Sequence, residues 1–343
     1  MSLNNSSPAI FELAKTNRIL ISCTVELTEN CIFKCPHCFI EGIGHHSLSY
    51  ENFVSFINQF KRMGGVFLTL TGGEALTHSR FVDIYKYAYK LGLSVSVFTN
   101  GYLITQDIIQ LFKECPPAKI EISLYGASKE KYQCVTGIEN SFEKVLSSID
   151  ALLEAGVNLF LKTTLFNDIY PEFEAIRKIA EIRGVPFKYD FKLFPKRDGE
   201  KTNLCCQVPP DKVIAIEKKE KMELWKKEFP SLPKHRDYLF ECGAARYSCF
   251  LSSKNTVRIC AAATFSDIDM NTSTLEQAWK EFKTYTLKKY NESSKCKDCE
   301  KAGLCDICPI WGYVMHDDVN MLGREVSLHC ELAEERLKEL LNA

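Results

Sequence analysis

Three cysteines near the start of the chain have a spacing that suits iron chemistry. They stand in the run Cys31-Ile-Phe-Lys-Cys35-Pro-His-Cys38, with gaps of three and two residues. Three thiolates can bind three corners of a four-iron cubane and leave the fourth iron without a protein ligand. Such an iron can chelate a substrate directly and pass an electron to it. A zinc site or unrelated buried thiols are the alternatives that these three residues leave open.

A second motif, Thr71-Gly72-Gly73-Glu74, ends the next predicted strand. Two adjacent glycines allow the backbone to approach a ligand closely, and the Glu74 carboxylate can accept hydrogen bonds from an ammonium group. A Gly-Gly-Glu tripeptide by itself is only a turn. Together with the three cysteines, however, it weakens the zinc alternative.

The last part of the chain carries a second set of cysteines. Two Cys-x-x-Cys pairs five residues apart would suggest a four-cysteine zinc site if they stood alone. Eight thiols, however, are the number that two fully ligated four-iron clusters need. The eight are Cys242, Cys249, Cys260, Cys296, Cys299, Cys305, Cys308 and Cys330.

The elements that must position these motifs read as alternating strands and helices up to about residue 195, the pattern of parallel strands with crossover helices. The predicted strands cover residues 20–27, 66–71, 94–99, 119–124, 158–164 and 187–194, and the predicted helices cover 50–63, 81–91, 105–114, 141–155 and 170–182. Six such units predict an α/β fold with a partial (β/α)6 TIM-like barrel. We expect a small cysteine-rich iron–sulfur domain to follow this barrel. Barrels of this kind carry their chemistry at the carboxyl ends of the strands, where the motifs fall.

A polar stretch with several prolines, residues 196–210, reads as a linker and leads to a predicted helix over 211–228. We therefore expect a barrel over residues 1–205, a linker with its helix over 206–240, and a cysteine-rich domain over 241–343. That last domain has few periodic segments before an amphipathic helix over 331–341. Metals commonly hold together a domain too small for a full apolar core.

Composition narrows the function classes. The chain has 343 residues, 45% of them hydrophobic, and a formal net charge of -1. Its charges are mixed in sign, so we do not expect nucleic acid as a partner, and no long apolar segment at the start predicts a membrane partner. The start resembles neither a signal peptide nor a membrane anchor, which predicts a cytoplasmic protein. Sixteen cysteines in a reducing compartment indicate metal ligation or redox chemistry rather than disulfides.

The cysteine triplet and the Gly-Gly-Glu strand end, on consecutive strands, resemble the radical S-adenosylmethionine superfamily over about residues 20–195. The resemblance implies that the cysteines hold a [4Fe–4S] cluster whose open iron chelates the methionine moiety of S-adenosylmethionine. Gly72, Gly73 and Glu74 would contact its amino group, and one-electron reduction would yield a 5′-deoxyadenosyl radical that abstracts hydrogen. His37 would then lie near the adenine and Ser123 near the ribose. Many members place an arginine, which contacts the cofactor's carboxylate, where Thr136 stands here. Lys162 offers a substitute for that arginine.

The order of the later cysteines resembles the SPASM extension of many radical S-adenosylmethionine enzymes. Asn255 stands at that pattern's glycine, and it tolerates left-handed backbone better than most residues. The gap between Cys305 and Cys308 is two residues rather than three. The resemblance implies two auxiliary [4Fe–4S] clusters, so that the chain would hold three clusters in all. Their ligands would be Cys242, Cys249, Cys260 and Cys308 for the first, and Cys296, Cys299, Cys305 and Cys330 for the second.

Fully ligated auxiliary clusters point to electron transfer and hence to net oxidation of the substrate. The family resemblance then implies a ribosomal peptide maturase that forms thioether or carbon–carbon cross-links, with a flavodoxin- or ferredoxin-type reductant. A formylglycine maturase of sulfatase type, a radical dehydrogenase of a small molecule and a non-catalytic zinc protein are the alternatives. Ala261 follows Cys260 where sulfatase maturases carry an aspartate base, and Asp190 offers a replacement base. We expect a monomer, and recognition of any leader peptide by a separate protein or by the barrel rim.

Overall fold

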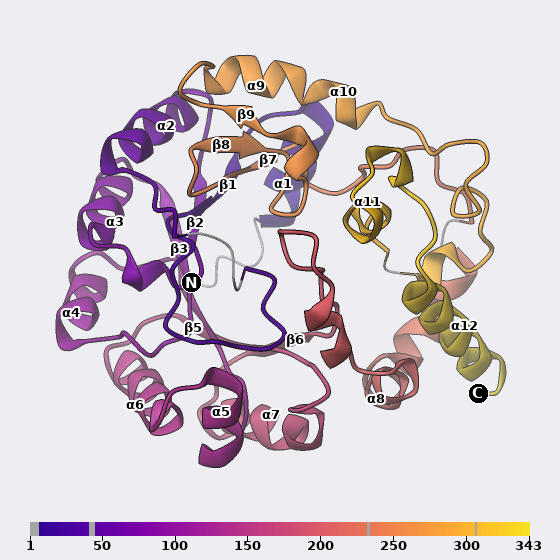
Figure 1. Cartoon of the computed structure of the whole chain (residues 1–343), viewed down its shortest axis with the longest axis horizontal. Helices are drawn as coiled ribbons and strands as arrows, with labels where there is room; N and C mark the ends of the chain where they lie inside the picture. Colours follow the sequence, from indigo (N-terminus) through magenta and orange to yellow (C-terminus); the bar gives the residue numbers. More distant parts are fainter. Residues whose placement is uncertain (1–6, 41–44, 232–233, 306) are drawn as a thin grey trace.

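The computed structural model describes residues 7–40, 45–231, 234–305 and 307–343. Figure 1 shows strands in the middle of the left half, a ring of helices around them, and the C-terminal helices on the right. The strand order is β6-β5-β4-β3-β2-β1-β7-β8-β9 in one sheet. The first six strands are parallel to one another, so the predicted α/β partial barrel is confirmed.

The barrel strands lie close to their predicted positions. They are β1 (Ser22–Glu26), β2 (Phe67–Thr71), β3 (Ser94–Thr99), β4 (Lys119–Ser123), β5 (Leu159–Thr164) and β6 (Phe187–Asp190). The sixth strand ends earlier than predicted. Beyond Asp190, Leu193 N donates to the Gln207 side chain and Phe191 O accepts from it, so these residues bond to a side chain instead of a neighbouring strand.

The crossover helices are α2 (Tyr50–Arg62), α3 (Phe81–Lys90), α4 (Gln106–Glu114), α6 (Ser141–Glu154) and α7 (Phe173–Ile182). An additional helix, α5 (Lys129–Thr136), precedes α6 and was not predicted. In α2 the buried residues are Phe53, Phe56, Ile57 and Phe60, at the spacing that aligns side chains on one face of a helix. Ser49 begins this helix, since its side chain accepts a hydrogen bond from Asn52 N.

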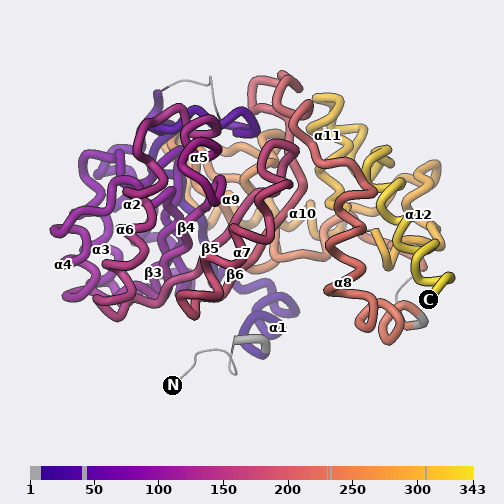
Figure 2. The backbone as a smooth tube through the Cα atoms, turned by 90° about the horizontal axis from the view of Figure 1, so that it is seen from below, coloured from indigo at the N-terminus to yellow at the C-terminus, as the bar shows by residue number. Residues whose placement is uncertain are grey.

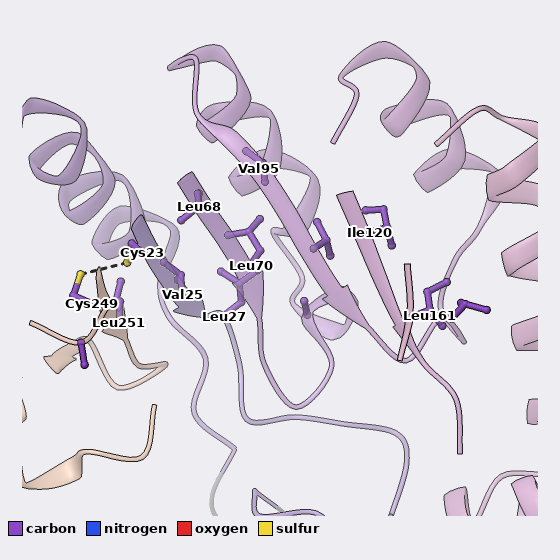
Figure 3. Close-up of a cluster of buried hydrophobic side chains, with 14 of the residues drawn as sticks. Cys23, Val25, Leu27, Leu68, Leu70, Val95, Ile120, Leu161, Cys249 and Leu251 are labelled. Carbon is purple, nitrogen blue, oxygen red and sulfur yellow. Dashed lines mark hydrogen bonds between the residues drawn. The ribbon is translucent and has the colours of Figure 1, made fainter. Parts of the chain in front are cut away.

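The helix-facing side of the sheet forms the main core. Cys23, Val25, Leu68, Leu70, Val95, Ile120 and Leu161 lie there, all nearly inaccessible to solvent (Figure 3). Alternate residues of the same strands point into the barrel, because side chains in a strand alternate between its two faces. Polar and charged side chains such as Glu26 and Glu121 therefore lie in the interior although the strands are buried.

A short helix closes the opposite end of the barrel from the cysteine motif. This helix, α1 (Ser7–Asn17), was not predicted and lies below the strands in Figure 2. The Phe11 ring stacks on Phe67, the first residue of β2, with the ring centroids 5.1 Å apart. The amino ends of the strands are thus covered, while the carboxyl ends carry the loops described below.

The barrel sheet continues beyond residue 241, where the sequence predicts a separate domain. Strand β7 (Ser248–Leu251) pairs in parallel with β1, and β8 (Thr256–Arg258) and β9 (Ile268–Asp269) follow it in antiparallel order. Asn255, in the turn between β7 and β8, has a φ of 59°, which confirms the left-handed backbone expected there. The hairpin therefore belongs to the same sheet as the barrel.

The remaining helices are α8 (Pro210–Glu228), α9 (Leu275–Glu281), α10 (Lys283–Thr286), α11 (Ile310–His316) and α12 (Ser327–Leu341). The predicted helices over 211–228 and 331–341 are confirmed. Helix α12 begins one turn earlier than the prediction. Helices α8 and α12 lie side by side, where Arg336 forms a buried pair of hydrogen bonds with Glu217. Among the described residues, no helix is long and apolar enough to cross a bilayer.

Candidate active site

A cavity of about 370 Å³ opens at the carboxyl ends of the barrel strands. It brings together nearly all the residues that the sequence singled out in the first part of the chain. These are Cys31, Cys35, Cys38, His37, Gly72, Gly73, Ser123, Lys162 and Asp190. They come from the ends of five strands and the loops after them, so the barrel topology collects residues that lie far apart in sequence.

The three cysteines lie on the loop that follows β1. The loop is fixed at Lys34, whose N–H donates to Thr136 O, and by a tight turn in which Cys38 N donates to Cys35 O. Burial, together with the charges of the nearby Glu74 and Cys38, raises the pKa of Cys31 to about 11. Thiols with such pKa values become thiolates only beside a strong positive charge. An iron cluster supplies that charge, so the donor set fits a cubane bound at three corners.

Gly72 and Gly73 allow the end of β2 to pack tightly against the chain that leads into Cys31. A Cβ on Gly72 would lie 2.6 Å from Thr28 O, and one on Gly73 would lie 2.5 Å from Glu29 O. The close approach inferred from the two glycines is therefore, first, an approach to the protein's own backbone. Both glycines also line the cavity, so their peptide groups are available to a ligand there.

Glu74 lies behind the cavity wall. The residue is only 1% exposed. Its carboxylate accepts hydrogen bonds from Leu76 N, Thr99 Oγ1 and Asn100 N, at 3.0, 2.7 and 2.6 Å. Burial raises its pKa, although these three donors act in the opposite direction. Its contacts hold the end of β3 against β2 rather than reach into the cavity.

Thr99 and Asn100 thereby become part of the site, although the sequence did not single them out. Both line the cavity, and Asn100 Nδ2 lies 3.8 Å from Cys31 Sγ, within donating distance of a sulfur. The signal that could have identified them is their place at the end of the third strand, in Thr99-Asn100-Gly101. Strand ends of one sheet edge share one site.

His37 is a neutral ring in an aromatic wall. Its ring stacks on Phe166, with centroids 4.2 Å apart, and lies 5.3 Å from the Tyr125 ring. Burial lowers its pKa to about 4. Its buried Nδ1 has no hydrogen-bond partner within the described part of the chain. A flat, partly polar ligand such as a purine could stack beside this wall and satisfy that nitrogen.

Ser123, Lys162 and Asp190 line the side of the cavity formed by β4, β5 and β6. Ser123 pairs with Lys162 in the sheet register. The Lys162 ammonium is directed toward Glu121, which lies deeper in the barrel, at 3.4 Å. The Asp190 carboxylate accepts a hydrogen bond from Lys192 N at 3.0 Å and remains partly open to the cavity.

The segment after β6 forms a roof over this cavity. Asn203 donates to both His37 O and Phe194 O, at 3.3 and 2.8 Å, and so fastens the segment to the cysteine loop. Arg197 N donates to Phe39 O, and its guanidinium pairs with the buried carboxylate of Glu26 at 2.7 Å. The sequence predicts a linker here, and the structure shows a packed part of the site.

A second group of thiols adjoins the cavity. Cys242, Cys260 and Cys308 lie near enough to influence one another electrostatically, and burial raises the pKa of Cys260 to about 12 and that of Cys308 to about 11. Lys192 lines the cavity and acts on Cys308 as well. The two sites are therefore neighbours.

Cys249 does not join this group. It lies on β7 directly beside Cys23 of β1, its register partner, and the two sulfurs are 3.6 Å apart (Figure 3). Both face the helices, and Cys249 is 3% exposed. Because side chains alternate along a strand, the register that buries Cys249 there turns it away from Cys242 and Cys260. The group thus supplies three thiols, enough for three corners of a cubane.

The third group of thiols consists of four of the later cysteines. Cys296, Cys299, Cys305 and Cys330 surround a small cavity of about 30 Å³ between the last loops and α12. Arg236 donates to the carbonyl groups of Ala302 and Cys305, which fixes the loop that carries them. Four thiols around one space fit a fully ligated cubane.

Within the described ranges, no three Cys, His, Asp or Glu side chains converge as the ligands of one ion would.

An aromatic contact joins the cavity roof to the C-terminal part. The Phe194 ring, which lines the cavity, stacks on Trp311 with centroids 4.3 Å apart and an interplanar angle of 12°. Trp311 also contacts the buried His329 ring, next to Cys330. The C-terminal part is therefore packed onto the site.

Comparison with known proteins agrees with this geometry. Residues 25–181 match the radical SAM superfamily. The chain is 30% identical over 208 residues to the AdoMet-dependent heme synthase of Oleidesulfovibrio alaskensis, covering 60% of this chain and 52% of that protein. It is 25% identical over 251 residues to the subtilosin biosynthesis protein AlbA of Bacillus subtilis, covering 69% and 54%. The chain thus spans about half the length of these curated relatives.

Two solved structures share the fold across almost the whole chain. Streptococcus suis SuiB bound to S-adenosylmethionine has a TM-score of 0.70 at 13% identity, covering 95% of this chain and 81% of SuiB. Native anSMEcpe with bound AdoMet and a peptide has a TM-score of 0.67 at 14% identity, covering 94% and 97%. The likeness of fold therefore extends beyond residue 181 into the cysteine-rich part, as the resemblance to SPASM-type enzymes implies.

Proposed function

We propose that this chain, whose residues 25–181 match the radical SAM superfamily, is an iron–sulfur enzyme that oxidatively modifies a peptide. The observation that carries this proposal is the cavity that joins Cys31, Cys35 and Cys38 to the glycine-lined end of β2 and to a second thiol group beside it. Net oxidation needs a place where hydrogen is removed and a nearby acceptor for an electron. The two neighbouring groups provide these two places.

In this proposal the cavity residues bind and orient. Cys31, Cys35 and Cys38 would hold a [4Fe–4S] cluster, and peptide groups of Gly72 and Gly73 would meet the amino group of S-adenosylmethionine. His37 and Ser123 would contact the adenine and the ribose. When bound and reduced, the cluster and cofactor supply a 5′-deoxyadenosyl radical that removes one hydrogen atom from the substrate. The roof segment, fixed by Asn203 and Arg197, would exclude water from that step.

The remaining electron must leave the substrate to complete a two-electron oxidation, together with a proton. Asp190, at the cavity edge, is the proposed acceptor of the proton. Cys242, Cys260 and Cys308 would hold the cluster that receives the electron, and Cys296, Cys299, Cys305 and Cys330 the one that passes it on. A flavodoxin- or ferredoxin-type protein would supply the first electron and take up the last.

The peptide substrate is supported by the relatives whose names mention peptides. AlbA serves biosynthesis of the bacteriocin subtilosin, SuiB has been solved with the precursor peptide SuiA, and anSMEcpe with the Kp18Cys peptide. Thioether or carbon–carbon cross-linking is the proposed outcome. A leader peptide would be bound by a separate protein or at the barrel rim.

The test is cofactor cleavage by anaerobically prepared, cluster-replete protein with dithionite. The expected product is 5′-deoxyadenosine, at about twelve irons per chain for three cubanes. Cys35→Ala should abolish its formation, because two thiols do not hold the cluster. Cys299→Ala should still form 5′-deoxyadenosine while product from a peptide substrate is lost. Absence of 5′-deoxyadenosine from the wild-type protein would refute the proposal.

A further inference from the structure

The interior of the barrel, below the cofactor site, carries an excess of positive charge around one buried carboxylate. Glu121 of β4 is inaccessible to solvent, and three lysines contact it: Lys119 at 2.6 Å, Lys188 at 2.8 Å and Lys162 at 3.4 Å. Although burial raises the pKa of Glu121, these lysines outweigh that effect and lower it. One negative charge therefore faces three positive charges.

The three lysines differ in what they reach. Lys119 and Lys188 have side chains that are 36% and 53% exposed, so water solvates them. The Lys162 side chain is 24% exposed and is the member of this cluster that lines the cavity. Its ammonium lies 3.7 Å from the centroid of the Phe98 ring. An ammonium has three N–H donors, and one carboxylate oxygen and one aromatic face do not satisfy all three.

The depth of this ammonium separates it from the cofactor residues. Glu121 lies two residues before Ser123 on β4, on the same face, and Phe98 is its register partner on β3. Two residues of a strand span about 6–7 Å. The Lys162 ammonium thus lies beside Glu121 and Phe98, deeper in the barrel than the strand ends that carry Gly72, Gly73 and Ser123.

We propose that Lys162 binds a carboxylate of the substrate, namely an acidic side chain of the peptide, inside the barrel. The inference rests on the proposed function, since it assigns the chemistry of the molecule that the same cavity holds. A carboxylate suits the position because it is the anion that peptide side chains carry. It would also complete the hydrogen bonds of an ammonium group whose side chain is only 24% exposed. This assigns Lys162 to the substrate and not to the carboxylate of S-adenosylmethionine.

The experiment uses a minimal acidic probe on the holoenzyme. N-acetylglutamate α-amide, deuterated on its side-chain carbons, is incubated with cluster-replete protein, S-adenosylmethionine and dithionite, beside the equally deuterated N-acetylglutamine α-amide. Mass spectrometry of the 5′-deoxyadenosine then reports deuterium taken from a probe bound within reach. We expect the acidic probe to transfer about tenfold more deuterium than the amide, the effect of one charge-assisted hydrogen bond.

Lys162→Met should abolish this preference, so that both probes transfer about equal deuterium, because the side chain keeps its length and loses its charge. Lys188→Met is the matched control, since it removes a charge from the same Glu121 cluster outside the cavity, and it should keep the tenfold preference. Equal transfer from both probes by the wild-type protein, or no transfer from either, would overturn the inference. So would a Lys162→Met protein that keeps the preference, or whose main defect is a dissociation constant for S-adenosylmethionine raised about tenfold or more. Absence of 5′-deoxyadenosine itself would refute the proposed function instead.

Discussion

At the scale of single residues, cysteines that are close in sequence are separated because their side chains point to different sides of the sheet. Cys249 lies on β7 and packs on Cys23 in the helix-facing core, whereas Cys260 follows β8 and lies with Cys242 and Cys308. The family resemblance assigns Cys249 to a cluster. The register of β7 on β1 gives it a packing position instead.

Iron analysis distinguishes these two assignments. Cys249→Ala should leave the iron content at about twelve per chain, while Cys260→Ala should lower it to about eight, because only the second removes a thiol from a cluster-binding group. Removing a buried sulfur also leaves a small cavity, so Cys249→Ala should cost about 1 kcal/mol of unfolding free energy. A loss of four irons in Cys249→Ala would contradict the placement seen here.

Lys162, which we propose binds the substrate, should lower the stability of the fold. Burial lowers its pKa to about 8, against the raising effect of Glu121, so the folded state disfavours its charged form. This cost is present in full below pH 8 and decreases as the pH rises toward the unfolded value near 10.5. We therefore expect Lys162→Met to raise the unfolding free energy by roughly 2 kcal/mol at pH 7.

Urea unfolding of the two proteins at pH 7 and pH 9.5 checks this expectation. The difference between them should shrink at the higher pH, because the wild-type lysine then loses its proton. Lys188→Met, whose side chain is 53% exposed, should show no comparable gain. A Lys162→Met protein less stable than wild type at pH 7 would show that the ion pair with Glu121 dominates.

At the scale of elements, the segment between β6 and α8 connects the barrel to the cysteine loop. Its key contact is the pair of Arg197 with Glu26, a carboxylate that is 1% exposed and also accepts hydrogen bonds from Ser253 N and Oγ. The Arg197 guanidinium lies 5.1 Å from the Phe39 ring as well. One side chain therefore holds three segments together.

Arg197→Met should destabilise the protein by about 3–5 kcal/mol, because it leaves the Glu26 carboxylate buried without its cation. The amides of residues 191–207 should exchange hydrogen faster, as measured by mass spectrometry. The double variant Glu26→Gln with Arg197→Met should recover part of the lost stability, since no unpaired charge then remains buried. If the single variant were as stable as wild type, the pair would not be what fixes the roof.

At the scale of the whole molecule, barrel and cysteine-rich part share one sheet. Strand β7 covers the edge of β1, and Figure 1 shows the hairpin beside the first barrel strands. A chain that ends at residue 240 would expose the backbone of β1 and the apolar side chains of Val25 and Cys23. An unpaired apolar edge strand promotes aggregation.

We expect the 1–240 fragment to be insoluble or to elute as an aggregate in size-exclusion chromatography under conditions where the 1–343 chain does not. Adding residues 241–269 to the fragment restores strands β7, β8 and β9 and should recover part of the soluble protein. A folded, monodisperse 1–240 fragment would show that the barrel is an independent domain after all.

The sequence by itself determined the barrel strands, all the helices between them except α5, and the two local cysteine motifs. Apolar alternation and helical spacing are local patterns, and a metal motif such as Cys31-x3-Cys35-x2-Cys38 lies within one loop. Helix α1 was missed because its packing partner, Phe67, lies far along the chain. The role of the segment after β6 was missed because it depends on side chains such as Asn203 and Arg197 that reach distant backbone.

Only the tertiary structure decided which thiols share a site and which polar residues face the interior. The side chains of Cys249 and Lys162 have opposite orientations for the same physical reason, since strand register fixes the face of every side chain. Register turns Cys249 toward the helices and Lys162 toward the cavity. A register joins residues far apart in the chain, so the sequence could name Cys249 and Lys162 as candidates but not the neighbours that each one meets.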